Sequence, residues 1–383
     1  MKPFNFSIMQ NCYFGKGALG KLPEILKTCG EKHVLLVSDR GLEGIGLVKK
    51  VQDLVTGAGL KCDTFLDVKA NPTIEVDNAC IKAFKESGAT GLLALGGGSP
   101  MDVAKITGVV ARYGGEVTDY EGPDKVPGPI PTLIAIPTTA GTGSEVTVNA
   151  VFTDTKRIFK GSLRSQEIVP KHAILDPELI MTAPASVAAA CGIDAFVHAL
   201  ECYINTITNP FSDAFAEKAM ELIGGYIRRY VANRSDEDAA SAMLLGSTFA
   251  GIAFSNARLG IVHAMSHPVS AYYDIAHGVA NAVLLPSILE FNALADKGRY
   301  AKVYTYITGR LPGADFEPIR FVDEVRKLNI ELGIPVGLEA VGVGADKIPA
   351  MSRDTFQNQG IMVNPRSVTL RDIEGIYHKA MKS

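Results

Sequence analysis

The sequence predicts an α/β first half, built on a doubly wound and mostly parallel sheet, followed by an all-helical second half. Three observations lead to this prediction. Short apolar runs alternate with helix-like segments from about residue 33 to 180. Strand-like runs nearly vanish after 177–186, where long helical patterns begin. A chain of 383 residues also exceeds one ordinary core, so we expect two domains, 1–183 and 184–383.

The elements of the first half follow one another in a regular βα order. Strands that alternate with helices form parallel sheets covered on both faces. Thr73 is expected to cap the second helix, and Pro100 to be the first residue of the third. We expect strands at 33–39, 61–68, within GLLALGGGS (91–99) and within TLIAIPTTAGTGSEVT (132–147), and helices at 45–59, 73–89 and 100–113.

The second half has apolar residues at helical spacing and few strand-like runs. SDEDAASAMLLG opens with acidic residues, which favour a helix start. We expect helices at 187–205, 211–231, 236–254, 258–270, 278–294, 317–332, 345–354 and 369–381.

Composition narrows the class of protein. A net charge of −3 gives no reason to expect a nucleic-acid partner. The six cysteines are scattered without a CxxC pair, which favours a reduced, intracellular compartment. The opening MKPFNFSIMQ lacks the apolar core of a signal peptide, and no apolar run looks long enough to span a bilayer. We therefore expect a cytoplasmic protein with no membrane partner.

Histidines in an apolar setting suggest a metal site. His263 and His267 are four residues apart, so they share one face of a helix, and His277 follows ten residues later. Upstream, Asp194 and His198 form another pair at the same spacing. One carboxylate with up to three imidazoles suits a divalent first-row metal. Spacing alone does not say which of His263 and His267 binds it, and a single histidine on an apolar helix is more often a hydrogen-bonded core residue.

Three features of the first half lie where strands end, the usual ligand-binding edge of such sheets. GGGSPMD (96–102) offers glycine amides and a helix N-terminus to a phosphate, although tight packing alone also explains glycines there. TTAGTGSEVT (138–147) offers hydroxyls and amides, or forms only a capping turn. Asp39 could accept hydrogen bonds from an adenosine ribose, or simply cap the next helix. Together the three features indicate a nucleotide site.

These motifs resemble the iron-containing (group III) alcohol dehydrogenase family, which includes lactaldehyde:propanediol oxidoreductase and 1,3-propanediol dehydrogenase. The resemblance covers nearly the whole chain, from FGKGAL (14–19) through GGGSPMDVAK and PTTAGTGSEVT to GIDAFVHALE and GIVHAMSHPVSAYYDIAHGVANAVLLP. It implies the dehydroquinate synthase-like fold of that family. It also implies a metal-dependent, NAD(H)-linked alcohol dehydrogenase or aldehyde reductase acting on a short-chain alcohol, diol or aldehyde.

The resemblance assigns the metal ligands. They fall on Asp194, His198, His263 and His277, and the metal is typically Fe2+, with Zn2+ in some members. His267 would lie beside the metal and the nicotinamide without binding the metal, where it orients substrate or relays a proton. Family members commonly form homodimers or larger assemblies.

The resemblance also assigns cofactor positions. Asp39 stands where the family marks a preference for NAD over NADP. A nucleotide on one domain is expected to meet a metal on the other in a cleft between them. The other positions expected to bind or flank the cofactor are Asn71, Gly96, Gly97, Gly98, Ser99, Asp102, Thr138, Thr139, Thr142, Asn149, Lys160 and Leu179.

The substrate is less closely defined. Two interpretations of Arg258 remain open: it binds an anionic tail, as in sulfoacetaldehyde or phosphonoacetaldehyde, or it pairs with a carboxylate or carbonyl at a helix end. A non-redox, dehydroquinate synthase-like lyase would need a cluster of Lys and Arg around the metal, which the sequence does not suggest. Positions expected to line a small, partly apolar pocket are Asn149, Val151, Phe254, Arg258, Leu259 and Met362.

Overall fold

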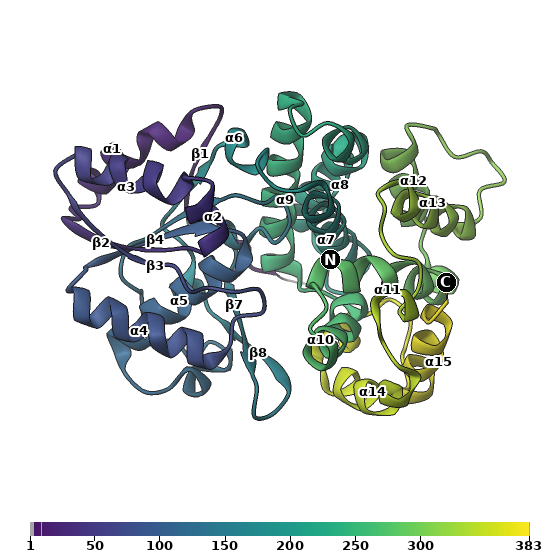
Figure 1. Ribbon diagram of the computed structural model, residues 1–383. Helices are drawn as coiled ribbons and strands as arrows, with labels where there is room; N and C mark the ends of the chain where they lie inside the picture. The colour runs from purple at the N-terminus through teal and green to yellow at the C-terminus, as the bar shows by residue number, and fades with distance from the viewer. Residues whose placement is uncertain (1–3, 9, 383) are drawn as a thin grey trace. The chain divides into compact units, whose positions relative to one another are not determined.

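The computed structural model describes residues 4–8 and 10–382. The chain forms two compact units, a sheet unit and a helical unit. Ile8–Thr139 and Gly143–Thr182 make up the sheet unit. The helical unit holds the chain from Ala183 onward, together with Ala140–Thr142 and the described residues before Ile8 (Figure 1).

The sheet unit is built on six strands whose neighbouring pairs are all parallel. This confirms the predicted doubly wound sheet, and each of the four expected strands is present. The two strands at one edge, β1 and β9, were not predicted. In sheet order the strands are β1 (Asn11–Phe14), β9 (His172–Leu175), β6 (Leu133–Pro137), β4 (Gly91–Gly96), β2 (His33–Val37) and β3 (Lys61–Phe65).

Alternation along β2 explains why both faces of the sheet are covered. Val34 and Leu36 pack in one buried cluster, whereas Leu35 and Val37 pack in another. Helices α1 and α3 supply the first cluster, and α4 and α5 supply the second. The bounds of these helices are α1 Leu22–Thr28, α3 Leu47–Gly57, α4 Ile74–Ser87 and α5 Gly98–Tyr113.

Local details of this unit differ from the sequence predictions. Helix α5 begins at Gly98, so Pro100 is its third residue and not its first. Thr73 does precede α4, but its side chain makes no capping hydrogen bond. A second, three-stranded sheet was not anticipated; it has the order β5 (Gly122–Pro123), β8 (Phe159–Arg164) and β7 (Asn149–Asp154). Two short helices, α2 (Arg40–Gly44) and α6 (Pro177–Ile180), complete the unit's α-helices.

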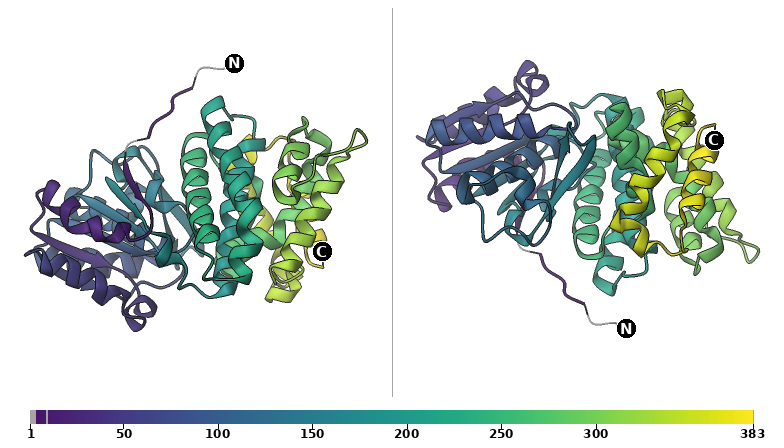
Figure 2. Two further views of the ribbon diagram at one scale, coloured as in Figure 1. Left: turned by 90° about the horizontal axis from the view of Figure 1, so that it is seen from above. Right: turned by 90° about the horizontal axis from the view of Figure 1, so that it is seen from below.

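All eight helices predicted for the second half are present, and Figure 2 shows them packed side by side. Helix α12 was missed, because its Tyr, Thr and Val content favours a strand more than a helix. The bounds are α7 Ala185–Ile204, α8 Pro210–Ala232, α9 Glu237–Ala257, α10 Ile261–Tyr273, α11 His277–Asn292, α12 Arg299–Thr308, α13 Pro318–Glu331, α14 Ile348–Gln357 and α15 Leu370–Ala380.

Two helices of this unit are long and apolar enough to cross a membrane, by length and composition only: α7 and the stretch His277–Ala295. The prediction that no apolar run reaches that length is therefore wrong. However, 78% and 61% of their most apolar windows are buried inside the structure. Burial in the helical core is sufficient to explain their apolar character.

Candidate metal centre and cofactor loops

The four residues expected to bind a metal come from three helices of the helical unit. Asp194 and His198 lie one turn apart on α7, His263 lies in the first turn of α10, and His277 is the first residue of α11. A side chain at Gly278 would overlap the carbonyl oxygen of Ala190 on α7. Glycine at this position therefore lets α11 approach α7 closely.

Their donor atoms converge on Asp194. Its Oδ1 lies 3.8 Å from His263 Nε2, 3.9 Å from His277 Nε2 and 4.0 Å from His198 Nε2. Three of the four residues, Asp194, His263 and His277, have donor atoms that all lie within 4.8 Å of one another. Donors in a tetrahedral site with bonds of about 2.1 Å lie about 3.4 Å apart. The observed separations are slightly wider and suit a small divalent cation.

The protonation of the site also suits a cation. His263 is buried, and burial, followed by the neighbouring His198, lowers its pKa to about 3. A neutral imidazole keeps the lone pair that a metal requires. The ring of His198 stacks on the ring of His263, with centroids 4.6 Å apart. It also stacks on the ring of Phe254, again with centroids 4.6 Å apart. Nitrogen and oxygen donors of this kind fit Fe2+ or Zn2+.

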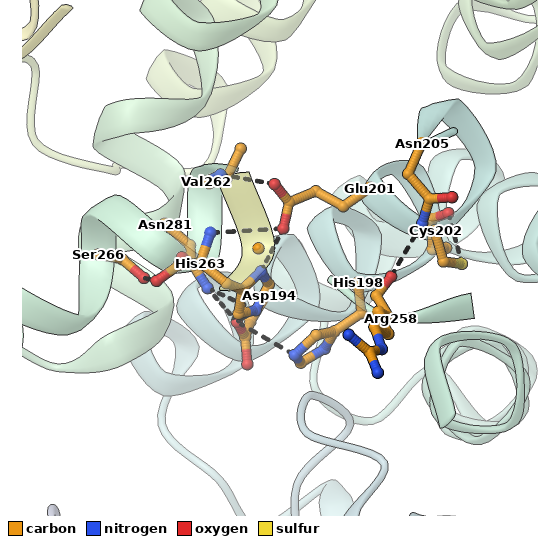
Figure 3. A network of polar contacts seen from close by, with 12 residues as sticks. Asp194, His198, Glu201, Cys202, Asn205, Arg258, Val262, His263, Ser266 and Asn281 are labelled. Carbon is orange, nitrogen blue, oxygen red and sulfur yellow. Dashed lines mark hydrogen bonds and ion pairs between the residues drawn. The ribbon is translucent and has the colours of Figure 1, made fainter. Parts of the chain in front are cut away.

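A second set of contacts orients two of the imidazoles. His263 Nδ1 lies 2.6 Å from Oε2 of the buried Glu201 (Figure 3). His198 Nδ1 lies 3.3 Å from the carbonyl oxygen of Gly141. With each Nδ1 donating to an oxygen, Nε2 is left free to face a metal. Sequence reasoning missed Glu201, although it lies seven residues after Asp194 and therefore on the same face of α7.

Glu201 itself is held by backbone groups at the start of α10. Its Oε1 accepts from the Val262 amide at 2.5 Å. A Cβ at Gly260 would lie 3.0 Å from the same oxygen, so a small residue is needed there. Burial raises the pKa of Glu201 to about 7, although hydrogen bonds from these backbone amides oppose the rise.

His267 lies beside this group. It is half-buried on α10, and its ring centroid lies 6.4 Å from that of His263 and 5.4 Å from that of His277. It is not among the three residues whose donor atoms cluster most tightly. This placement suits a side chain that acts next to the metal ligands.

The two glycine-rich loops of the sheet unit pack against each other. The Thr138 amide donates to the Gly96 carbonyl at 2.9 Å. A Cβ at Gly97 would lie 3.1 Å from Thr139 Oγ1, and Gly96 has a φ of 148°, which L residues rarely adopt. Gly97 is the N-cap of α5, and Gly98 and Ser99 are its first two residues. The structure thus brings both predicted nucleotide loops together at a helix N-terminus, which favours an anion.

A buried lysine that sequence reasoning missed joins the second loop to α5. Lys105 Nζ donates to the carbonyl oxygens of Ser144, Thr147 and Asn149 at 2.7, 3.0 and 2.8 Å. Burial lowers its pKa to about 8, and the nearby Asp102 opposes this change. Because so many oxygens surround the ammonium, we regard Lys105 as charged at neutral pH. No local pattern in the sequence distinguishes this lysine from an exposed one.

Asp102 is the acidic partner in this loop network. Its Oδ1 accepts from Ser144 Oγ at 3.0 Å. Burial raises the pKa of Asp102 to about 6, while Lys105 acts in the opposite direction.

The other predicted cofactor positions occupy varied settings. Asp39 is the N-cap of α2 and accepts from the Leu42 amide at 3.0 Å. Asn71, in a left-handed conformation, accepts from Lys160 Nζ at 2.7 Å. Leu179 on α6 is buried in a core cluster of the sheet unit. Thr142 belongs to the short segment grouped with the helical unit.

The predicted pocket residues lie on both units. Asn149 and Val151 are half-buried on β7 of the sheet unit. In the helical unit, Phe254 is buried against His198 and Leu259 is half-buried. Met362 is 79% exposed, on the 3-10 helix Gln359–Val363.

Arg258, the other predicted pocket residue, follows the last residue of α9. Its side chain is exposed, and Nη1 lies 3.4 Å from Gln359 Oε1. Among the described residues, no carboxylate lies within ion-pair distance of the Arg258 guanidinium.

Comparison with known proteins gives a consistent result. Residues 10–177 match the family model for iron-containing alcohol dehydrogenase, and residues 188–381 match the model for the C-terminal part of the Fe-containing alcohol dehydrogenase family. The chain is 38% identical to lactaldehyde reductase of Escherichia coli, covering 97% of this chain and 98% of the relative. It is 36% identical to NAD-dependent methanol dehydrogenase of Bacillus methanolicus, covering 98% and 100%. A crystal structure of 1,3-propanediol oxidoreductase superposes with a TM-score of 0.94 at 33% identity, covering 99% and 100%.

Proposed function

The chain belongs to the iron-containing alcohol dehydrogenase family and is an oxidoreductase of alcohols and aldehydes, and from this premise we propose how its residues divide the work. Asp194, His198, His263 and His277 would hold one divalent cation, Fe2+ by preference and Zn2+ as the alternative. The observation that supports this most strongly is the single oxygen, Asp194 Oδ1, within 4.0 Å of three imidazole nitrogens.

The reaction we propose is reversible hydride transfer between NAD(H) and a short-chain alcohol, diol or aldehyde. Reduction consumes the aldehyde, NADH and one proton, and yields the alcohol and NAD+. When bound, the cation is a Lewis acid that polarises the carbonyl oxygen and stabilises the alkoxide. Three neutral imidazoles and one carboxylate leave a divalent site with net positive charge, which favours that alkoxide.

The protein's own side chains would support this chemistry in two ways. Glu201 and the Gly141 carbonyl fix the orientation of His263 and His198, so their Nε2 atoms need not reorganise during the reaction. His267, half-buried beside the ligands, would orient the substrate or move the proton to or from its oxygen.

We further propose that the sheet unit binds NAD(H), which supplies the hydride. The loops at 96–99 and 138–142 would hold the pyrophosphate and adenosine, and Asp39 would accept from the ribose hydroxyls. Within this proposal, residues 1–183 bind nucleotide and residues 184–383 bind metal. We also propose that the protein is cytoplasmic, as its scattered cysteines suggest, and that it forms a homodimer or larger homo-oligomer, as members of the family commonly do.

The substrate we favour is a small aldehyde or diol of the kind named for the relatives. One observation supports a second candidate, an anionic aldehyde such as sulfoacetaldehyde or phosphonoacetaldehyde. Arg258 has no carboxylate partner among the described residues, so its guanidinium is available for an anionic group.

The test is a substrate panel on metal-reconstituted protein. NADH oxidation would be followed with propanal, lactaldehyde and sulfoacetaldehyde, and aldehyde loss measured in parallel. We expect equimolar consumption of NADH and at least one aldehyde. Protein that holds its metal and NADH but oxidises NADH with none of the panel would contradict the proposed substrate class.

A further inference from the structure

Asn281 lies at the centre of the candidate metal site, although it is not among the four expected ligands. It is on α11, one turn after His277, and is fully buried. Its Nδ2 lies 2.7 Å from Asp194 Oδ1 and 3.2 Å from His263 Nε2 (Figure 3). The same nitrogen lies 3.2 Å from His277 Nε2. One amide nitrogen therefore faces all three of the most tightly clustered donor atoms.

The other end of the same amide has no such partners. Within the part of the chain that the structure describes, Oδ1 of Asn281 is buried and accepts no hydrogen bond. A buried acceptor without a partner destabilises the folded protein, because it has lost its hydrogen bonds to water. The two ends of a carboxamide have nearly the same shape, so it can exchange them by rotation about its last side-chain bond.

A cation reverses the electrostatic preference of this amide. Without one, the NH2 group faces a carboxylate oxygen and two imidazole nitrogens, all of which are hydrogen-bond acceptors. A cation that contacts those same three atoms must share the space in front of the amide nitrogen. Positive charge there repels the NH2 protons and attracts the carbonyl oxygen.

We propose that Asn281 is a further residue of the metal site, which turns its carboxamide oxygen toward a bound divalent cation and its NH2 group toward the donors when no cation is bound. The inference rests on the metal site proposed above. Amide oxygens are suitable donors for hard divalent cations. As a neutral donor, the amide adds a ligand without reducing the net positive charge that the alkoxide requires.

The experiment measures metal affinity, not activity. Wild-type protein, stripped of metal, would be titrated with Co2+ and Zn2+ against a competing chelator. Asn281→Leu keeps the approximate size but removes both amide ends, and we expect it to weaken binding about 10–100-fold, the usual range for a lost supporting group. Asn281→Asp keeps an oxygen in place, and we expect binding as tight as wild type or tighter.

Asn329 provides a matched control. It is also buried, its Nδ2 donates to a backbone carbonyl, Ala282 O, at 2.7 Å, and its Oδ1 accepts no hydrogen bond among the described residues. It lies on α13, and among the described residues its side chain forms no hydrogen bond with the four proposed ligands. We expect Asn329→Leu to lose stability but to keep wild-type metal affinity.

The outcomes separate the inference from the proposed function. Absence of metal binding by wild-type protein would reject the metal site itself. If wild type binds metal and Asn281→Leu binds it equally well, only the role of Asn281 fails. If Asn281→Asp binds as weakly as Asn281→Leu, the NH2 group is the functional end, and the proposed oxygen donor is wrong. The Co2+ visible spectrum gives a second readout, because we expect the loss of an oxygen donor to alter the band positions in Asn281→Leu and not in Asn329→Leu.

Discussion

Glu201 Oε2 and His263 Nδ1 lie 2.6 Å apart, and both side chains are buried. Because a metal would bind His263 through Nε2, the carboxylate contacts the other ring nitrogen, Nδ1. It selects the tautomer and fixes the ring orientation. Glu201 is therefore a positioning residue for the proposed metal ligand.

We predict that Glu201→Ala lowers metal affinity about 10–100-fold, because the imidazole loses its orienting partner. Glu201→Gln should lose less, since an amide oxygen can still accept from Nδ1–H. Metal affinity by chelator competition is the measurement, with circular dichroism as the check on folding. Equal affinity in a folded Glu201→Ala protein would show that packing alone orients His263.

His263 and His267 should respond differently to the same substitution. His263 Nε2 is 3.8 Å from Asp194 Oδ1, whereas His267 lies outside the tightest donor cluster. We expect His263→Ala to lose both metal and activity, because three remaining ligands bind more weakly. We expect His267→Ala to keep its metal and lose turnover about 10²–10⁴-fold, the usual contribution of a proton-transfer group. Metal content would be measured by elemental analysis; full occupancy in His263→Ala would contradict the assignment.

Repeating patterns made most of the fold predictable. Four strands of the parallel sheet follow from short apolar runs between helix-like segments, and eight helices of the second half follow from helical spacing. The sequence did not predict the edge strands β1 and β9 or the β7–β8 hairpin, because short runs such as NCYF have no distinct periodicity. The spacing of Asp194 and His198 indicated a metal site, and the resemblance to the family chose between His263 and His267.

Residues whose roles depend on partners far away in the sequence were not predictable. Glu201 becomes significant only because α10 brings His263 to it across 62 residues. Likewise, Lys105 looks like an ordinary helix lysine in the sequence. Only the structure shows that its ammonium donates to the carbonyl oxygens of Ser144, Thr147 and Asn149. A carboxylate or ammonium has the same local sequence signal whether it is buried or exposed.

Asp39 can be tested for a role beyond its helix cap. Its side chain accepts from the Leu42 amide, so the capping interpretation describes at least part of what it does. Asp39→Gly should change stability by only a few tenths of a kcal/mol, because glycine is itself an acceptable N-cap. We predict that it also raises kcat/KM with NADPH relative to NADH, because it removes charge repulsion against the 2′-phosphate. If the ratio of kcat/KM with NADPH to kcat/KM with NADH is unchanged, Asp39 serves only as a helix cap.

Asp77 should make stability depend on pH. It is fully buried on α4 with no hydrogen-bond partner for either oxygen among the described residues. Burial, followed by Asp102 and Glu75, raises its pKa well above the ordinary value. Between the ordinary and the raised pKa, the folded state holds a proton that the unfolded state has released. The free energy of unfolding must therefore fall as the pH rises through that window.

Asp77→Asn removes this dependence. We expect it to raise the free energy of unfolding at pH 7 by about 1–3 kcal/mol, and by less at pH 4. Urea unfolding at the two pH values is the measurement, with the exposed Asp346→Asn as the matched control. An equal effect of Asp77→Asn at both values would mean that the carboxyl is not titrating in the folded protein.

Arg258 combines a strained backbone with an available charge. Its φ of 61° and ψ of 162° lie in a region used almost only by glycine, and Asn205 Nδ2 donates to its carbonyl at 3.0 Å. Such strain costs about 1–3 kcal/mol and is most often kept at functional sites. Arg258→Gly should therefore raise stability, by less than the full strain because glycine gains entropy when unfolded.

The same variant tests the anionic substrate. If the guanidinium binds a sulfonate, Arg258→Gly should lower kcat/KM for sulfoacetaldehyde at least about tenfold, the value of one charged hydrogen bond of about 1.4 kcal/mol. Propanal has no anionic group, so its kcat/KM should change little. Added salt should weaken sulfoacetaldehyde turnover in wild type more than in the variant, because it screens the charge. If kcat/KM fell by the same factor for both aldehydes, Arg258 would only maintain the loop conformation. Neutral short-chain substrates would then be the better match.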